Sequence, residues 1–327
     1  MTGSAKRKIL PFILFGVSAL GYGIVCYGEE ERYTGENHTL TLARGPEPPG
    51  SSSGLSFHIE PIEFLEQKRY RILTEHYDII SACRETGISA GTQLSHLFQA
   101  GHLLFAEHFE MPKRPDSPDT DSPDRHRVII YRDKQEYAAE LLPVEPSIRL
   151  TNGLYFAPKK TIYLYEAAPK NLYHEGTHQI FLEYFFKETA PTFRNNFWAV
   201  EGIALFMETL TIQEKYYQAG NVLADRLFAA KKYHFERNYR MPIRQLASMG
   251  AIEVQSSAER QQIYSQSAAI VHWLLFAEGG KHRNALFELI RQVYLGTSTP
   301  TSLSELTGLS FDELDKKYAE FLALIPD

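Results

Sequence analysis

The sequence is poor in cysteine: Cys26 and Cys83 are the only two among 327 residues. Because Cys26 lies inside an apolar N-terminal run, no disulfide framework is available to the rest of the chain. The two residues are also too far apart in the sequence to form a CxxC redox or metal-binding pair. The fold must therefore depend on a hydrophobic core, and a chain of this length can bury a sizeable one.

Net positive charge is also missing. Lys and Arg number 34 against 40 Asp and Glu, which gives a formal net charge of −6. This composition lacks the basic footprint that nucleic-acid binding requires, so we expect no nucleic-acid partner. With 43% hydrophobic and 23% charged residues, most of the chain has the composition of an ordinary soluble globular protein.

The N-terminal segment departs from this average. Three basic residues, 6–8, precede the uncharged run from Ile9 to Cys26. A basic start followed by an apolar run is typical of a signal peptide or a membrane anchor, and residues 1–27 are interpreted as one or the other. Residues 28–56 are polar and rich in Pro, Gly and Ser, which predicts a flexible linker. The positive-inside tendency then places the rest of the protein outside the cytoplasm, membrane-anchored or secreted.

Strand patterns come first in the remaining chain, and helix patterns follow. "YRILTEHYDIISA" predicts one or two strands, "RVIIY" a buried strand, and "GLYFAPKKTIYLYE" a hairpin. "SAGTQLSHLFQAGHLLFAEHF" and "DKQEYAAELL" between them have helical spacing. Further helices are expected over 170–186, 197–211, 215–237, 259–277, 281–295 and 310–323.

This order predicts an α+β fold. We expect one domain over 57–327, with a small β-rich α/β part at 57–168 that includes the hairpin and a mainly helical part at 169–327. Two capping boxes support the late helices: Ser302 with Glu305, and Ser310 with Glu313.

The segment "NLYHEGTHQI" carries the clearest chemical pattern. On a helix, His174 and His178 lie on one face and can present two imidazole nitrogens to one ion. Zinc suits such a pair, because it accepts neutral imidazole at about 2.0–2.1 Å. Glu175 points away from the ligand line and can reach a water at the metal, as a general base must. The apolar and aromatic flanks indicate a core helix, where unpartnered His and Glu side chains would be costly.

A third ligand is expected from the next helix. Glu201 is a lone carboxylate in an apolar turn of "NNFWAVEGIALFMETL", and a buried carboxylate there needs a partner such as a dication. Gly176 and Gly202 lie beside the proposed ligands, although each costs about 1 kcal/mol relative to Ala inside a helix. We expect them to let the two ligand-bearing helices approach closely.

"HEGTH" followed by Glu201 within "WAVEGIALFME" resembles the gluzincins, the thermolysin-like zinc metallopeptidases. More narrowly, it is similar to uncharacterised bacterial peptidase-MA-like proteins with an EGxAxxxE second helix, over a region from about Tyr70 to the C-terminus. The resemblance implies a zincin-like helical domain, with zinc held by His174, His178 and Glu201. It further implies that Glu175 is the catalytic base that activates a zinc-bound water.

The resemblance also implies that an extended peptide or protein substrate lies on an edge strand, Thr161–Tyr165. One departure from thermolysin-type sites is Leu205, which stands where those sites have an Asp behind the metal ligands. Glu208, on the same helix face, is a candidate replacement.

The family also tends to use a Tyr or His to stabilise the oxyanion. Tyr264 is our candidate for this residue, with His272 and His234 as alternatives.

The sequence as a whole thus predicts an extracytoplasmic zinc metallopeptidase that contacts the membrane through its N-terminal segment. The alternative is a catalytically inactive peptidase fold that serves as a binding or assembly module at the cell envelope. Hydrolysis that depends on Glu175 would separate the two.

Overall fold

The structure, a computed structural model, describes residues 39–43, 55–109, 125–143, 148, 151–186, 192–214 and 216–326. The predicted signal peptide or membrane anchor at 1–27 lies outside these ranges and stays a prediction. Among the described helices, none combines the length and the apolar character needed to cross a membrane.

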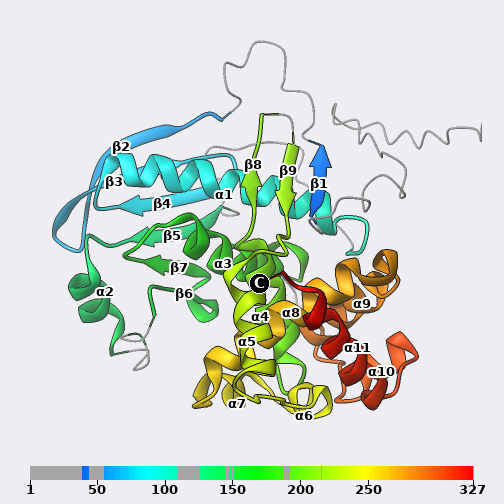
Figure 1. The fold of residues 1–327 in the computed structure, drawn as a ribbon. Coiled ribbons are helices and arrows are strands. Elements are labelled where there is room, and N and C mark those ends of the chain that lie inside the picture. The colour runs from blue at the N-terminus through cyan, green and yellow to red at the C-terminus, as the bar shows by residue number, and fades with distance from the viewer. Residues whose placement is uncertain are drawn as a thin grey trace, which may run out of the picture.

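A six-stranded mixed sheet forms one half of the molecule (Figure 1). The strands follow the order β2 (His58–Phe64), β3 (Gln67–Leu73), β4 (Tyr77–Ser81), β5 (His126–Ile130), β7 (Thr161–Leu164) and β6 (Gly153–Phe156). The β4–β5 and β5–β7 pairs are parallel, and the other pairs are antiparallel. The hairpin predicted from "GLYFAPKKTIYLYE" is confirmed as the β6–β7 pair.

Both faces of the sheet are covered, because alternate side chains of its central strands enter two different cores. In β5, Val128 belongs to the larger core and Ile129 to the smaller one. Helices α1 (Arg84–Phe105) and α3 (Pro169–Ile180) pack against the sheet within the larger core. Helix α2 (Lys134–Leu141) closes the smaller core.

The other half of the molecule is mainly helical, which confirms the α+β class (Figure 1). Its helices are α4 (Phe197–Met207), α5 (Asp225–Phe235), α6 (Ile243–Ser248), α7 (Ala251–Ser256), α8 (Arg260–Gly280), α9 (Arg283–Tyr294), α10 (Ser302–Thr307) and α11 (Phe311–Leu324). All eleven residues of α4 are buried, and α4 packs against both α3 and α8. This central position brings together α3 and α4, the helices that carry the three predicted ligands.

One of the two predicted capping boxes forms. Ser310 caps α11 by accepting from the backbone N–H of Glu313, and the Glu313 carboxylate accepts from the Ser310 backbone N–H. The box predicted for Ser302 is wrong, because Thr301 occupies the N-cap position of α10.

A second, small sheet corrects two predictions. Residues 40–43 lie within the predicted linker, yet they form β1 (Leu40–Ala43), which pairs with β9 (Tyr216–Ala219). The segment forms a strand because Leu40 and Leu42 alternate with the exposed Thr41 and Ala43. One side of the segment can therefore pack against the core while its backbone pairs with β9. Strand β9 also pairs with β8 (Thr211–Ile212), so the helix predicted from residue 215 begins only at Asp225.

The position of the edge strand also differs from the prediction. We expected Thr161–Tyr165 to be exposed for strand addition, but β7 lies between β5 and β6, with both sides of its backbone paired. Among the described strands, the edge strand next to α3 is therefore β6. Sequence pattern identifies a hairpin but does not say which of its strands faces outward.

Candidate metal centre

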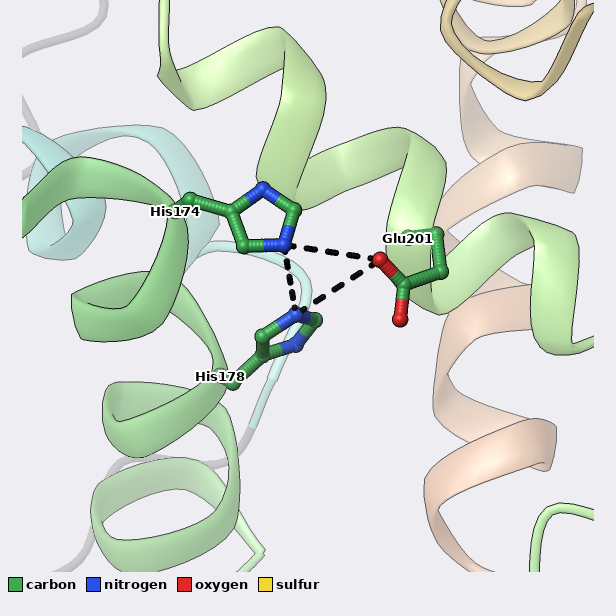
Figure 2. A group of neighbouring side chains, drawn as sticks. All are labelled: His174, His178 and Glu201. Carbon is green, nitrogen blue, oxygen red and sulfur yellow. Dashed lines mark hydrogen bonds and ion pairs between the residues drawn. The ribbon is translucent and has the colours of Figure 1, made fainter. Parts of the chain in front are cut away.

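Three side chains from α3 and α4 converge on one point (Figure 2). His174 and His178 project from successive turns of α3, and their Nε2 atoms are 3.3 Å apart. The Glu201 Oε2 atom on α4 lies 3.4 Å from His174 Nε2 and 3.9 Å from His178 Nε2. The structure thus brings together all three residues that the sequence identified as ligands.

The spacing of these atoms fits a small metal ion. Ligands about 2.0–2.1 Å from a tetrahedral zinc lie about 3.3 Å from one another. Two of the three separations, 3.3 and 3.4 Å, match this spacing, and the third is 3.9 Å. In addition, Glu201 Oε2 is buried and makes no hydrogen bond within the structure. A buried carboxylate oxygen without a donor is costly, and a cation would satisfy it.

The electrostatics of the cluster also favour a bound cation. Burial alone would lower the pKa of His174, but its interactions with the Glu201 and Glu208 carboxylates and the charge of Glu175 together raise it well above its ordinary value. Burial would raise the pKa of Glu201, yet the interaction with His174 and the His178 charge lower it. The carboxylates therefore stabilise positive charge at this point, whether a proton or a metal ion carries it.

His178 behaves differently from His174. Burial lowers its pKa to about 4, and the nearby His174 adds to the effect. Its imidazole is therefore neutral at pH 7, which is the form that coordinates metals. The buried His–His–Glu cluster can hold a metal ion without first losing a proton from His178.

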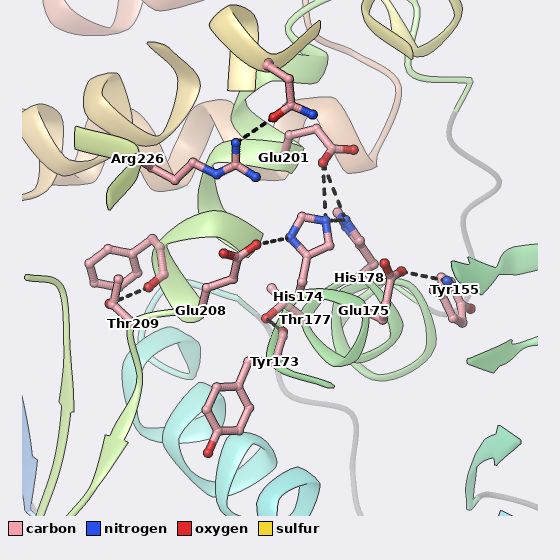
Figure 3. A network of polar contacts seen from close by, with 12 residues as sticks. Tyr155, Tyr173, His174, Glu175, Thr177, His178, Glu201, Glu208, Thr209 and Arg226 are labelled. Carbon is pink, nitrogen blue, oxygen red and sulfur yellow. Dashed lines mark hydrogen bonds and ion pairs between the residues drawn. The ribbon is translucent and has the colours of Figure 1, made fainter. Parts of the chain in front are cut away.

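Behind the cluster, Glu208 orients one ligand (Figure 3). Its Oε1 atom lies 2.9 Å from His174 Nδ1, on the opposite side of the ring from Nε2. An imidazole that donates Nδ1–H to a carboxylate keeps Nε2 free as a metal ligand. Glu208 thus supplies the carboxylate behind His174. Leu205 cannot do so, because it is an apolar side chain buried in the core.

Glu175 stays outside the ligand set and turns toward the free edge of the sheet (Figure 3). Its Oε2 accepts a hydrogen bond of 2.6 Å from the backbone N–H of Tyr155 in β6. Burial raises the pKa of Glu175, partly offset by the charge of His174. A Cβ atom at Gly153, also in β6, would lie 3.3 Å from Glu175 Cγ, so this strand packs directly on the Glu175 side chain.

Of the three candidates for the oxyanion group, the structure brings Tyr264 to the centre. Its hydroxyl interacts with Glu201, and burial followed by the charge of Glu201 raises the pKa of Tyr264. The hydroxyl therefore keeps its proton at neutral pH and can donate a hydrogen bond. His272 packs against Phe276 and Phe321, and His234 against Phe235 and Tyr318.

Gly176 and Gly202 permit close helix packing, but not between the two helices that we expected. A Cβ at Gly176 would lie 2.5 Å from Leu97 Cδ2 of α1. At Gly202 it would lie 2.6 Å from Val271 Cγ2 and 2.8 Å from the Ser267 carbonyl of α8. Gly176 therefore lets α3 pack closely against α1, and Gly202 lets α4 pack closely against α8.

One contact of the centre has no signal in the sequence. The hydrogen bond from Tyr155 to Glu175 uses a backbone N–H, and it depends on the register of β6 rather than on a residue type.

Comparison with known proteins adds no assignment to this geometry: no protein-family model matches the chain, and no curated protein is significantly similar to it in sequence.

Proposed function

We propose that the protein is a zinc-dependent metallohydrolase, most specifically a gluzincin-like peptidase. The observation that carries the proposal is the division of roles within one motif. His174 and His178 converge with Glu201, while Glu175, between them in sequence, stays outside the ligand set and is free to act as a base. A metal site with a structural role only has no need of this fourth group.

His174, His178 and Glu201 would hold the ion, and Glu208 would keep His174 in the required tautomer. When bound, zinc supplies Lewis acidity, which acidifies water and polarises a carbonyl group. Glu175 accepts the proton of the attacking water and passes it to the leaving amine.

Tyr264 donates a hydrogen bond to the oxygen on which negative charge develops. The free edge of β6 is the place for an extended peptide, since its backbone runs beside Glu175.

The competing proposal is an inactive binding or assembly module that retains the peptidase fold. A module of this kind does not need a base beside its ligands, whereas Glu175 is a buried carboxylate on which the charges of His174 and Glu201 act. Metal content alone does not separate the two proposals, because either could bind zinc.

The deciding experiment compares metal content and peptide turnover in three variants. His174→Ala/His178→Ala should lose the metal and the activity together. Glu175→Gln should retain one equivalent of metal but lower kcat by about 10²- to 10⁴-fold, because the amide cannot accept the proton. Glu201→Gln should weaken metal binding itself.

Two results would count against the peptidase. Wild-type turnover in Glu175→Gln would exclude Glu175 as the base. Failure of the fully metal-loaded wild-type protein to cleave any member of a broad peptide library would favour the binding module.

A further inference from the structure

Strand β6, which contacts the Glu175 side chain, is a short edge strand of the described sheet. Strand β6 contains four residues and pairs with a single neighbour, β7. In an antiparallel pair, residues alternate between those bonded to the partner strand and those whose backbone groups point outward. Tyr155 is of the second kind, because its N–H leaves the ladder and donates to Glu175. The position of Glu175 therefore depends on where β6 lies.

A buried polar cluster beyond Glu175 ties α3 to the sheet. The chain continues from α3 into a single π-helical turn, Phe181–Phe185, which carries Glu183. The Glu183 Oε2 atom is 2.8 Å from His126 Nδ1 at the start of β5, and these side chains are 11% and 7% exposed. Gln179 Nε2 donates to Glu183 Oε1 and to the Arg127 carbonyl, both at 3.1 Å. A π turn within a helix frequently marks a functional position.

Tyr155 joins this cluster to the metal centre. Burial, followed by the charge of Glu183, raises the pKa of the Tyr155 hydroxyl, which interacts with the Glu183 carboxylate. Because it stays protonated at neutral pH, this hydroxyl can donate a hydrogen bond to the Glu183 carboxylate. One residue thus contacts Glu175 through its backbone and Glu183 through its side chain.

We propose that Tyr155 is a positioning residue for Glu175, and that the Glu183–His126 pair anchors it. The anchor holds the short β6 strand at a fixed distance from α3, so that the Tyr155 N–H keeps the Glu175 carboxylate beside the ligand cluster. This inference rests on the proposed hydrolase for its effect on turnover, but the anchoring itself does not require a substrate.

The test uses the full-length protein and two variants, Tyr155→Phe and Glu183→Gln. The first removes only the hydroxyl, and the second keeps the shape of the side chain but removes its charge. Tyr239→Phe is the matched control, because its hydroxyl donates to Met241 Sδ, away from β6. Amide hydrogen exchange of the segment 153–156, zinc content, kcat and KM are measured for each protein.

We expect exchange in 153–156 to accelerate about tenfold in Tyr155→Phe and Glu183→Gln, corresponding to the loss of one hydrogen bond. We expect kcat to fall by a similar factor, while KM stays within about twofold and zinc content is unchanged. Tyr239→Phe should match the wild type in all four measurements.

Exchange in Tyr155→Phe equal to that in Tyr239→Phe would overturn the proposal. So would loss of zinc or of the folded state in Tyr155→Phe, since either would indicate a general structural role. If Glu183→Gln does not fold, the comparison of the two Tyr→Phe variants decides alone. A zinc-loaded wild type that cleaves no peptide would contradict the hydrolase only, because the exchange comparison needs no substrate.

Discussion

At the scale of single residues, Glu208 gives the sharpest prediction, because it contacts the candidate ligand His174 without belonging to the candidate ligand set. Its Oε1 atom lies 2.9 Å from His174 Nδ1. Glu208→Ala should therefore leave the ligand set intact but weaken metal binding by about 10- to 100-fold, the usual cost of losing such a partner. Competition with a chelator of known affinity measures the change. The exposed Glu236, changed to Ala, is the control, and equal zinc affinity in the two variants would exclude this role.

The candidate metal centre was predictable from sequence only where the spacing of residues on one helix determines their position. Two histidines one turn apart must share a face, and Glu208 follows Glu201 by two turns, so it lies on the same side of α4. Tyr155 could not be found in this way, because its contact is made by a backbone N–H. Tyr264 was identified only by the resemblance, since its approach to Glu201 depends on how α8 packs against α4.

At the scale of elements, the packing of α4 against α8 depends on Gly202. A Cβ there would meet the Ser267 carbonyl at 2.8 Å, and backbone cannot move aside as a flexible side chain can. Gly202→Ala should therefore lower the free energy of unfolding by about 1–3 kcal/mol, in spite of the better helix propensity of Ala. Urea denaturation of the metal-free protein measures this effect without a contribution from zinc.

Gly101 in α1 provides the matched control. Apart from the backbone of α1 itself, the nearest atom to a Cβ at this position would be Phe105 Cδ2, 4.0 Å away. Gly101→Ala should thus stabilise the protein by about 0.5–1 kcal/mol, through helix propensity alone. A shift of the same sign in both variants would show that close packing does not limit position 202.

The elements predicted correctly are those whose own sequence carries a clear signal, such as the helical spacing of apolar residues in α1 and the continuous apolar run of β5. The errors fall where a distant segment decides the outcome. Strand β9 begins with Tyr216 and Tyr217, which could equally continue a helix, and its strand conformation depends on pairing with β1 from the predicted linker. Gly220, with a φ of 87°, then separates β9 from α5.

At the scale of the whole molecule, stability should depend on pH through His76, a histidine outside the His174–His178–Glu201 cluster. The His76 ring stacks on Phe98, with ring centroids 4.0 Å apart. Burial lowers the pKa of His76 to about 3, and the charges of His126, His102 and Arg125 add to this effect. The only carboxylate paired with it in the described part of the chain is Glu75, at 3.8 Å.

The sign of the effect follows from these pKa values. Between pH 6.5, the ordinary pKa of histidine, and about pH 3, the unfolded chain binds a proton at His76 that the folded protein excludes. The stabilisation is therefore fully present above pH 6.5 and is lost as the pH falls. Its slope is at most about 1.4 kcal/mol per pH unit, corresponding to one proton.

His76→Phe tests this dependence, since it retains the aromatic stack on Phe98 but cannot titrate. We expect its free energy of unfolding, measured in urea with metal-free protein, to fall less steeply than that of the wild type between pH 6 and pH 4. His58→Phe is the control, because that side chain is 69% exposed and meets water in both the folded and the unfolded states. If all three proteins lose stability in parallel over this range, protonation of His76 does not contribute to acid unfolding, and the slope must come from other groups of the fold.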